Sequence, residues 1–197
     1  MKHVLCFGDS NTWGFIPGTC KRYDEHTRWT GILQDELGAD WRIHENGQNG
    51  RTTVFPEPGK DFMTGLGALP YALDTLRPLD AIIIMLGTND LLCGASPAEA
   101  AERMRIFISD LLVCGLPLLL VAPPLMQSGT WVESDALIRS SGQLAPLYRD
   151  LAALCGVSFC DASGWDIPVV FDGVHFSEQG HRRFAEQLEP VFAQTFL

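Results

Sequence analysis

Short, almost continuous apolar runs alternate along this chain with longer stretches whose apolar residues recur every three or four positions. The short runs predict β-strands, and the longer stretches predict amphipathic helices. Two of the runs, DAIIIML and PLLLVA, are typical of central parallel strands that are covered on both faces. The predicted strands cover residues 3–8, 41–45, 80–86, 117–122 and 157–161.

The predicted helices lie between these strands, over residues 29–37, 66–76, 97–114 and 137–155, with a last helix that runs to about 196. Two of them have clear start signals. Ser96 precedes a proline and, three positions on, Glu99, and Ser177 opens the last helix in a similar way. Regular strand–helix alternation predicts a doubly wound α/β sandwich with right-handed crossovers, formed as a single domain over residues 1–197.

Two segments, 47–67 and 123–134, fit neither pattern. Both follow predicted strands, so both are expected to overhang the carboxyl edge of the sheet. There they would wall a substrate pocket, although irregular loops remote from any chemistry are also common.

The composition and net charge limit the classes of protein to which the chain can belong. A chain of 197 residues that is 46% hydrophobic can bury a sizeable core. Its net charge of −10 argues against nucleic acid or an anionic membrane as a partner. The six cysteines form no CxxC pair, the first strand leaves no room for a signal peptide, and no apolar run reaches membrane-spanning length. We therefore expect a cytoplasmic protein with reduced thiols.

Residues that can carry chemistry follow the predicted strands. Ser10 follows the first strand, Gly50 the second and Asn89 the third, while Asp172 and His175 follow the fifth. Parallel strands deliver their carboxyl ends to one edge, so these distant residues are expected to share a cleft. A serine hydroxyl needs a base and a set of oxyanion donors, which suggests nucleophilic acyl transfer.

Each residue then has an expected role. His175 is the base for Ser10, and Asp172 orients the imidazole if residues 172–175 form a tight turn. The expected oxyanion donors are the backbone N–H groups of Ser10 and Gly50 and the side-chain amide of Asn89.

Four motifs in the order GDS, glycine, GTND and DGVH together resemble those of the GDSL/SGNH hydrolases. The resemblance implies a flavodoxin-like three-layer α/β/α sandwich with a five-stranded parallel sheet. It also implies a serine esterase that needs no metal or organic cofactor. The residues that match the family's motifs are Ser10, Gly50, Asn89 and His175, with Asp172 completing the triad.

The stretches CFGDSNTWG, RWTG, GRTT and IIMLGTND look more narrowly like the small bacterial arylesterase/acyltransferase branch. That branch implies short-chain acyl esters as substrates and, in some members, homo-oligomers that enclose the site. The GRTT match favours Gly50 over Gly47 as the oxyanion glycine, with Gly47 then a turn residue; strand spacing alone does not choose between them.

Neighbouring residues have simpler interpretations. Asp9 and Asp90 are expected to bond local backbone, and Arg51 to brace its loop through a salt bridge rather than bind an anionic substrate. Trp13, Trp131 and Phe176 are the predicted substrate-binding residues, with Phe15 and Phe171 as weaker candidates. The histidines show no i, i+4 pair and no completing cysteine, so no metal site is expected.

The sequence thus predicts a serine carboxylesterase that hydrolyses small-molecule, short-chain acyl (aryl) esters through an acyl-enzyme on Ser10, with acyl transfer to alcohols as a further activity. A carbohydrate acetylesterase, a thioesterase or a lysophospholipase with the same triad is the alternative. A flavodoxin-like binding domain with an inert serine is more remote, because residues 8–14 contain Trp13 and lack GxGxxG.

Overall fold

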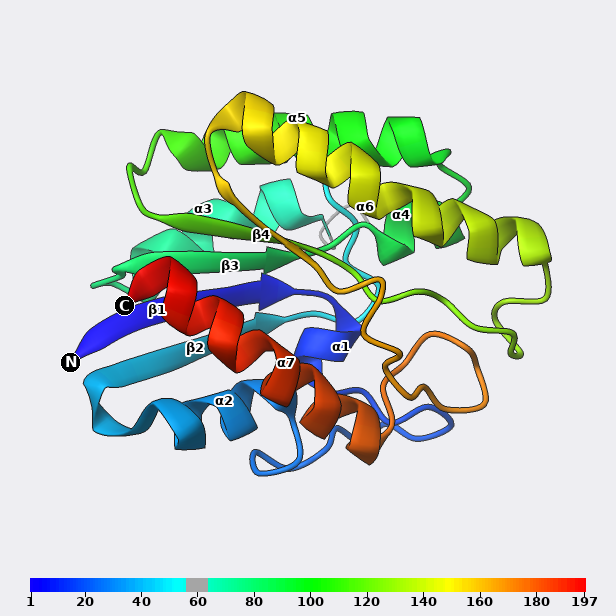
Figure 1. Cartoon of the computed structure of the whole chain (residues 1–197), viewed down its shortest axis with the longest axis horizontal. Coiled ribbons are helices and arrows are strands. Elements are labelled where there is room, and N and C mark those ends of the chain that lie inside the picture. Colours follow the sequence, from blue (N-terminus) through cyan, green and yellow to red (C-terminus); the bar gives the residue numbers. More distant parts are fainter. Residues whose placement is uncertain (56–63) are drawn as a thin grey trace.

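The predicted strands form one parallel sheet with the order β2-β1-β3-β4-β5 in this computed structural model, which describes residues 1–55 and 64–197 (Figure 1). The strands are β1 Lys2–Gly8, β2 Trp41–Gly47, β3 Ala81–Met85, β4 Leu118–Ala122 and β5 Ser158–Asp161. This is the doubly wound order in which the chain reverses direction across the sheet beside β1. The loops after β1 and β3 therefore meet at the point where ligands bind in such folds.

The helices among the described residues are α1 Ser10–Trp13, α2 Trp29–Leu37, α3 Gly65–Thr75, α4 Thr88–Leu92, α5 Pro97–Leu112, α6 Asp135–Cys155 and α7 Glu178–Phe196, with a 3₁₀ turn, η1, over Gly38–Asp40. The capping signals are confirmed: Ser96 and Glu99 form a reciprocal capping box on α5, and Ser177 caps α7 through the N–H of Gly180. The predicted 47–67 loop is too long, because its last residues form the first turn of α3.

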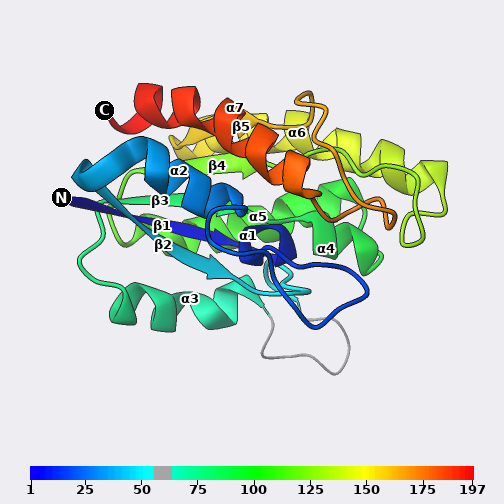
Figure 2. The ribbon, with the colours of Figure 1, turned by 90° about the horizontal axis from the view of Figure 1, so that it is seen from below.

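Three layers result. Helices α3, α5 and α6 cover one face of the sheet, and α2 and α7 cover the other, where they pack side by side (Figures 1 and 2). Alternate residues of the central strands point into the two cores: Ile82 and Ile84 into one, Ile83 into the other. The predicted sandwich is confirmed.

The amino ends and carboxyl ends of the strands define two edges of the molecule. Both chain termini lie beside the amino ends, while α1 and α4 lie beyond the carboxyl ends (Figures 1 and 2). The outer strand β2 is closed on its free side by Gln34 of α2, whose amide accepts from Ile43 N–H at 2.8 Å and donates to the carbonyl of Trp41 at 2.9 Å. No helix within the described part of the chain is long and apolar enough to cross a membrane.

Candidate active site

Ser10 is the first residue of α1, a four-residue helix directly after β1. Asp9 caps this helix by accepting the N–H of Asn11 at 2.9 Å. The turn is tight: a Cβ on Gly8 would lie 2.1 Å from the hydroxyl of Thr12. Glycine at position 8 thus allows the chain to turn at once from strand to helix, which leaves Ser10 at the carboxyl edge of the sheet.

A hydrogen-bond chain links Ser10, His175 and Asp172. Ser10 Oγ lies 2.9 Å from His175 Nε2, and His175 Nδ1 lies 2.7 Å from Asp172 Oδ2. A carboxylate can only accept, so Nδ1 carries the proton and Nε2 is free to accept from the serine hydroxyl. The three side chains that were predicted to meet are therefore brought together in the order needed for proton transfer.

The predicted tight turn at 172–175 also forms. Asp172 Oδ1 accepts the backbone N–H groups of Val174 at 2.9 Å and His175 at 3.0 Å, and Gly173 turns the chain at a φ of 83°. Burial by itself raises the pKa of Asp172. The hydrogen bonds from the His175 side chain and from the two backbone N–H groups outweigh burial and hold that pKa below its ordinary value. Asp172 is thus kept ionised opposite the imidazole.

The loops after β2 and β3 meet beside this chain of hydrogen bonds. Asn89, the second residue of α4, donates its side-chain amide to the carbonyl of Arg51 at 3.0 Å, which brings it next to Gly50. Gly50 adopts a φ of 74° in a turn closed by the bond from Arg51 N–H to the Gln48 carbonyl. A positive φ at the third position of such a turn favours glycine.

Gly47 meets a different requirement. It is the last residue of β2, and a Cβ there would lie 2.1 Å from the backbone nitrogen of Trp13. Glycine at this position lets the end of β2 touch the backbone of α1. The geometry therefore gives Gly47 a packing role and leaves Gly50 as the glycine beside Asn89.

Arg51 and Asp90 hold the loop after β2 in place. The buried Arg51 guanidinium donates to the carbonyls of Gly8 and Asn46 at 2.9 and 2.6 Å. Asp90 accepts from the N–H and hydroxyl of Thr53 at 3.0 and 2.8 Å. Asp90 does bond a backbone N–H, but that of the distant Thr53 rather than the predicted local backbone, and it also pairs with Arg103 at 3.3 Å. Arg51 braces its loop as expected, but its partners among the described residues are carbonyl and amide oxygens rather than the predicted salt bridge.

Aromatic rings cover the imidazole from two sides. Phe15 and Trp131 each present an edge-on contact to His175, with ring centroids 4.9 and 5.0 Å away. Trp13 packs at 6.2 Å from Phe15 and carries the guanidinium of Arg22 over its ring. Phe15, one of the weaker candidates for substrate binding, thus contacts the imidazole directly. Trp131 also contacts it, and about half of the Trp131 side chain is exposed.

Phe176 lies mainly in the core but also lines a small cavity, and its role in substrate binding stays a prediction. Its side chain is 1% exposed and packs against Phe184 and His181 in the core between the sheet and α7. Phe176 flanks the Asp172–His175 turn, and a backbone bridge pairs it with Val169. Phe176 supports the histidine turn from below.

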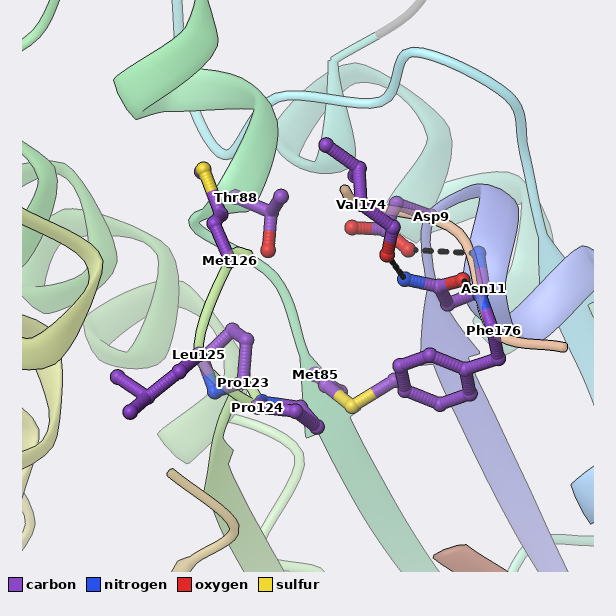
Figure 3. A pocket seen from close by; sticks show the side chains of 10 residues that line it. All are labelled: Asp9, Asn11, Met85, Thr88, Pro123, Pro124, Leu125, Met126, Val174 and Phe176. Carbon is purple, nitrogen blue, oxygen red and sulfur yellow. Dashed lines mark hydrogen bonds between the residues drawn. The ribbon is translucent and has the colours of Figure 1, made fainter. Parts of the chain in front are cut away.

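Asp9 and Asn11, the two residues next to Ser10, make contacts beyond those predicted from the sequence. Asp9 and Asn11 line a small cavity behind the nucleophile, together with Thr88, Val174 and other residues labelled in Figure 3. Burial raises the pKa of Asp9 to about 6, against the lowering effects of the Asn11 N–H and the His175 and Arg51 charges. The Asn11 side chain bonds the backbone on both sides of His175. No sequence motif marks this contact.

Several known proteins are similar to this chain. The model of the GDSL-like lipase/acylhydrolase family matches residues 6–183. The aryl esterase of M. smegmatis has 32% identity and a TM-score of 0.92, with 100% of both chains covered. Est24, a carbohydrate acetylesterase from Sinorhizobium meliloti, has 33% identity and a TM-score of 0.92 over the same coverage.

An arylesterase candidate from Agrobacterium tumefaciens str. C58 has 36% identity and a TM-score of 0.88, again with 100% of both chains covered. No curated protein sequence matches the chain. The family model spans most of the chain, and the structural relatives cover all of it. The chain therefore belongs to the GDSL-like lipase/acylhydrolase family, the SGNH hydrolases, and is a serine ester hydrolase.

Proposed function

We propose that this protein hydrolyses short-chain acyl esters, including aryl esters, through an acyl-enzyme on Ser10. The observation that carries the proposal is the continuous hydrogen-bond chain from Ser10 Oγ through His175 to Asp172, with successive distances of 2.9 and 2.7 Å. In this arrangement the nucleophile, its base and the group that orients the base are all within reach of one another.

In the first half of the reaction, His175 Nε2 takes the hydroxyl proton while Ser10 Oγ bonds to the ester carbonyl carbon. The imidazolium then returns that proton to the departing alcohol, and the carbon–oxygen bond to the alcohol breaks. In the second half, His175 takes a proton from water, and the resulting hydroxide oxygen bonds to the acyl carbon. Ser10 recovers its proton and the carboxylic acid leaves.

The negative charge that forms on the carbonyl oxygen needs fixed donors. As the first residue of α1, Ser10 has a backbone N–H without an intrahelical partner. We assign the other two donors to the N–H of Gly50 and the side-chain amide of Asn89. The bond from Asn89 to the Arg51 carbonyl fixes the orientation of that amide and leaves its second hydrogen for the oxyanion. Loss of one such donor costs roughly 3–4 kcal/mol of transition-state stabilisation.

A carbohydrate acetylesterase is the second candidate. It is favoured by the identity of 33% to Est24 over the full length of both chains. Both candidates remove a short acyl group and differ in the alcohol that leaves. A thioesterase or lysophospholipase would instead require a different leaving atom or a long acyl chain.

Acyl transfer and self-association belong to the same proposal. The rings of Phe15 and Trp131 shield His175, which favours an alcohol over water as the second acceptor. Trp131 and Phe171 are 51% and 65% exposed on adjoining loops, an apolar surface that a second copy of the chain would cover. Product ratios in aqueous alcohol and the mass in solution by light scattering test these two expectations.

The main test compares initial rates on p-nitrophenyl esters from acetate to decanoate. We expect the rate to peak at acetate or butyrate and to fall about 10⁶-fold in Ser10→Ala. Ser109→Ala, on the exposed face of α5, serves as the control and should keep the wild-type rate. Activity that persists in Ser10→Ala would refute the acyl-enzyme. A maximum at long chains would instead favour a lipid substrate, and acetylated sugars assayed in parallel separate the two short-acyl candidates.

A further inference from the structure

Asn11, the residue directly after the nucleophile, reaches across to the turn that carries His175. Its Nδ2 donates to the Val174 carbonyl at 3.1 Å, and its Oδ1 accepts the N–H of Phe176 at 2.9 Å. Figure 3 shows the Asn11 side chain between Val174 and Phe176, at the wall of the small cavity. One side-chain amide thus holds the peptide groups on both sides of the histidine.

These two bonds fix the position of the turn that carries His175 relative to α1, which bonds within the turn do not. The bonds from Asp172 to the backbone of Val174 and His175 lie within one turn, so they fix its shape but not its position relative to α1. Other backbone bonds attach this turn to the loop after β4, through Gln127 and Trp131. Within residues 10–13 and 172–177, all of which the structure describes, the hydrogen bonds that join α1 to the turn are the Ser10–His175 bond and the two from Asn11.

Asn11 is itself firmly held. Its N–H bonds Asp9 Oδ1 at 2.9 Å, and its carbonyl accepts from the indole N–H of Trp29 at 3.1 Å. Trp29 is 1% exposed and packs against Phe184 of α7. Because the backbone of Asn11 is held in place in this way, its side chain can hold the turn that carries His175 at a fixed position relative to α1.

We propose that Asn11 is a positioning residue, which clamps the backbone around His175 to α1 and so sets the distance between Ser10 Oγ and His175 Nε2. This inference rests on the proposed serine-esterase function, because it assigns Asn11 an effect on proton transfer between those two atoms. A displacement of about 1 Å at reacting groups can cost about 100-fold in rate. Loss of the clamp should therefore act on turnover more than on substrate binding.

The first variant is Asn11→Leu, which keeps a similar volume and removes both hydrogen bonds. We expect kcat for p-nitrophenyl acetate to fall about 10- to 100-fold with KM little changed. Modification of Ser10 by phenylmethylsulfonyl fluoride, followed by intact mass, should slow by a similar factor. That reaction also needs His175 to accept the serine proton as the Oγ–sulfur bond forms and fluoride leaves, yet it needs no ester substrate.

The second variant, Asn11→Asp, separates positioning from general destabilisation. A protonated carboxyl offers one O–H donor and one carbonyl acceptor, so it can remake both bonds, whereas the ionised form has no donor for the Val174 carbonyl. The titratable and charged groups near Asn11 are Asp9, Arg51, the His175–Asp172 pair and His181, which contacts Phe176 and Trp29. The kcat of Asn11→Asp relative to wild type should rise as the pH falls, while the same ratio for Asn11→Leu stays flat.

Gln34→Leu is the matched control, since it removes another side-chain amide that bonds backbone groups, those of Gly38, Trp41 and Ile43, at the outer edge of β2 and remote from Ser10. It should lower the melting temperature while kcat stays within about twofold. The proposal is overturned if Asn11→Leu keeps kcat and the Ser10 modification rate within threefold of wild type, or if the Asn11→Asp ratio does not change with pH.

The same experiments distinguish the proposed function from the clamp. If wild type is modified at Ser10 but hydrolyses no ester, the proposed function fails and the modification rates alone decide on Asn11. If wild-type Ser10 does not react with the reagent, the serine–histidine pair is inactive and the inference about Asn11 falls with it.

Discussion

At the scale of single residues, burial raises the pKa of both carboxylates beside the nucleophile, but only Asp172 accepts enough hydrogen bonds to reverse the effect. Asp172 receives hydrogen bonds from His175 and from two backbone N–H groups, so its pKa stays below the ordinary value despite burial. Asp9 is 2% exposed, and the bond from Asn11 N–H does not compensate for its loss of water, so its pKa rises to about 6. The hydrogen bonds that each acid accepts, set against its loss of water, therefore decide the direction of its pKa shift.

The raised pKa of Asp9 predicts a stability cost with a defined pH range. The unfolded chain loses this proton near pH 3.8 and the folded chain near 6, so stability from Asp9 falls as the pH rises between these values and is constant above them. The cost at pH 7 is about 3 kcal/mol. Asp9→Asn keeps an acceptor for Asn11 N–H, so it should be more stable than wild type at pH 7 and lose that advantage near pH 4. Urea unfolding from pH 4 to 8 measures this, and a difference that does not vary with pH would contradict it.

Single residues also mark the limit of prediction from sequence. Ser10, Asp172 and His175 were predictable because each follows a strand and carries a chemistry that few residue types supply. The contacts of Asn11 were not predicted, and the burial of Phe176 was left open, for one common reason. Where a side chain points after a turn depends on pairing with distant backbone, such as the bridge to Val169, which sequence spacing does not encode.

At the scale of elements, the strands and the longer helices were predicted from the sequence, and the two shortest α-helices were not. Every predicted strand formed, and the 29–37 helix has the predicted bounds. The helices α1 and α4 were not predicted, because four or five residues are too few to show a helical period. These two short helices hold Ser10 and Asn89, so the least predictable elements carry the site.

Gly47, the last residue of β2, and Gly50, in the loop that follows, give a prediction at this scale. Gly47→Ala places a methyl group against the backbone of Trp13, so β2 or α1 must move. We expect it to lower both the melting temperature and kcat markedly. Gly50→Ala meets the strain of its φ of 74°, about 1 kcal/mol, and keeps the backbone N–H, so kcat should fall less than tenfold. Thermal melts and ester kinetics on the two variants test this, and equal losses of kcat would contradict it.

At the scale of the whole molecule, the two faces of the sheet are held in different ways. The face covered by α3, α5 and α6 is a mainly apolar core, in which the Tyr148 hydroxyl donates to the Leu86 carbonyl. The face covered by α2 and α7 contains His181, which is fully buried and accepts the N–H of Trp29 at 3.4 Å. The rings of Tyr23 and Phe176 pack edge-on against it. The ionisable side chain of His181 therefore lies where α2, α7 and Phe176, the residue after His175, pack together.

This buried histidine predicts that the molecule is sensitive to acid. Burial lowers the pKa of His181 to about 3, with the charges of Arg28 and His175 adding to the effect. The unfolded chain takes up the proton near pH 6.5 and the folded chain only near 3, so stability is lost as the pH falls between these values, by about 3 kcal/mol at pH 4. His181→Asn keeps an acceptor near Nδ1 but cannot be protonated.

The variant should be less stable than wild type at pH 8, because a smaller side chain leaves space in the core, yet its stability should fall less between pH 6.5 and 4. His26→Asn is the control: this histidine is exposed, and Asp35 raises its pKa, so its removal should not flatten the acid dependence. Urea unfolding curves across this pH range give the comparison. Parallel curves for wild type and His181→Asn would assign the acid sensitivity to other groups, whereas a flatter curve for this variant alone would place it in the contact between α2 and α7.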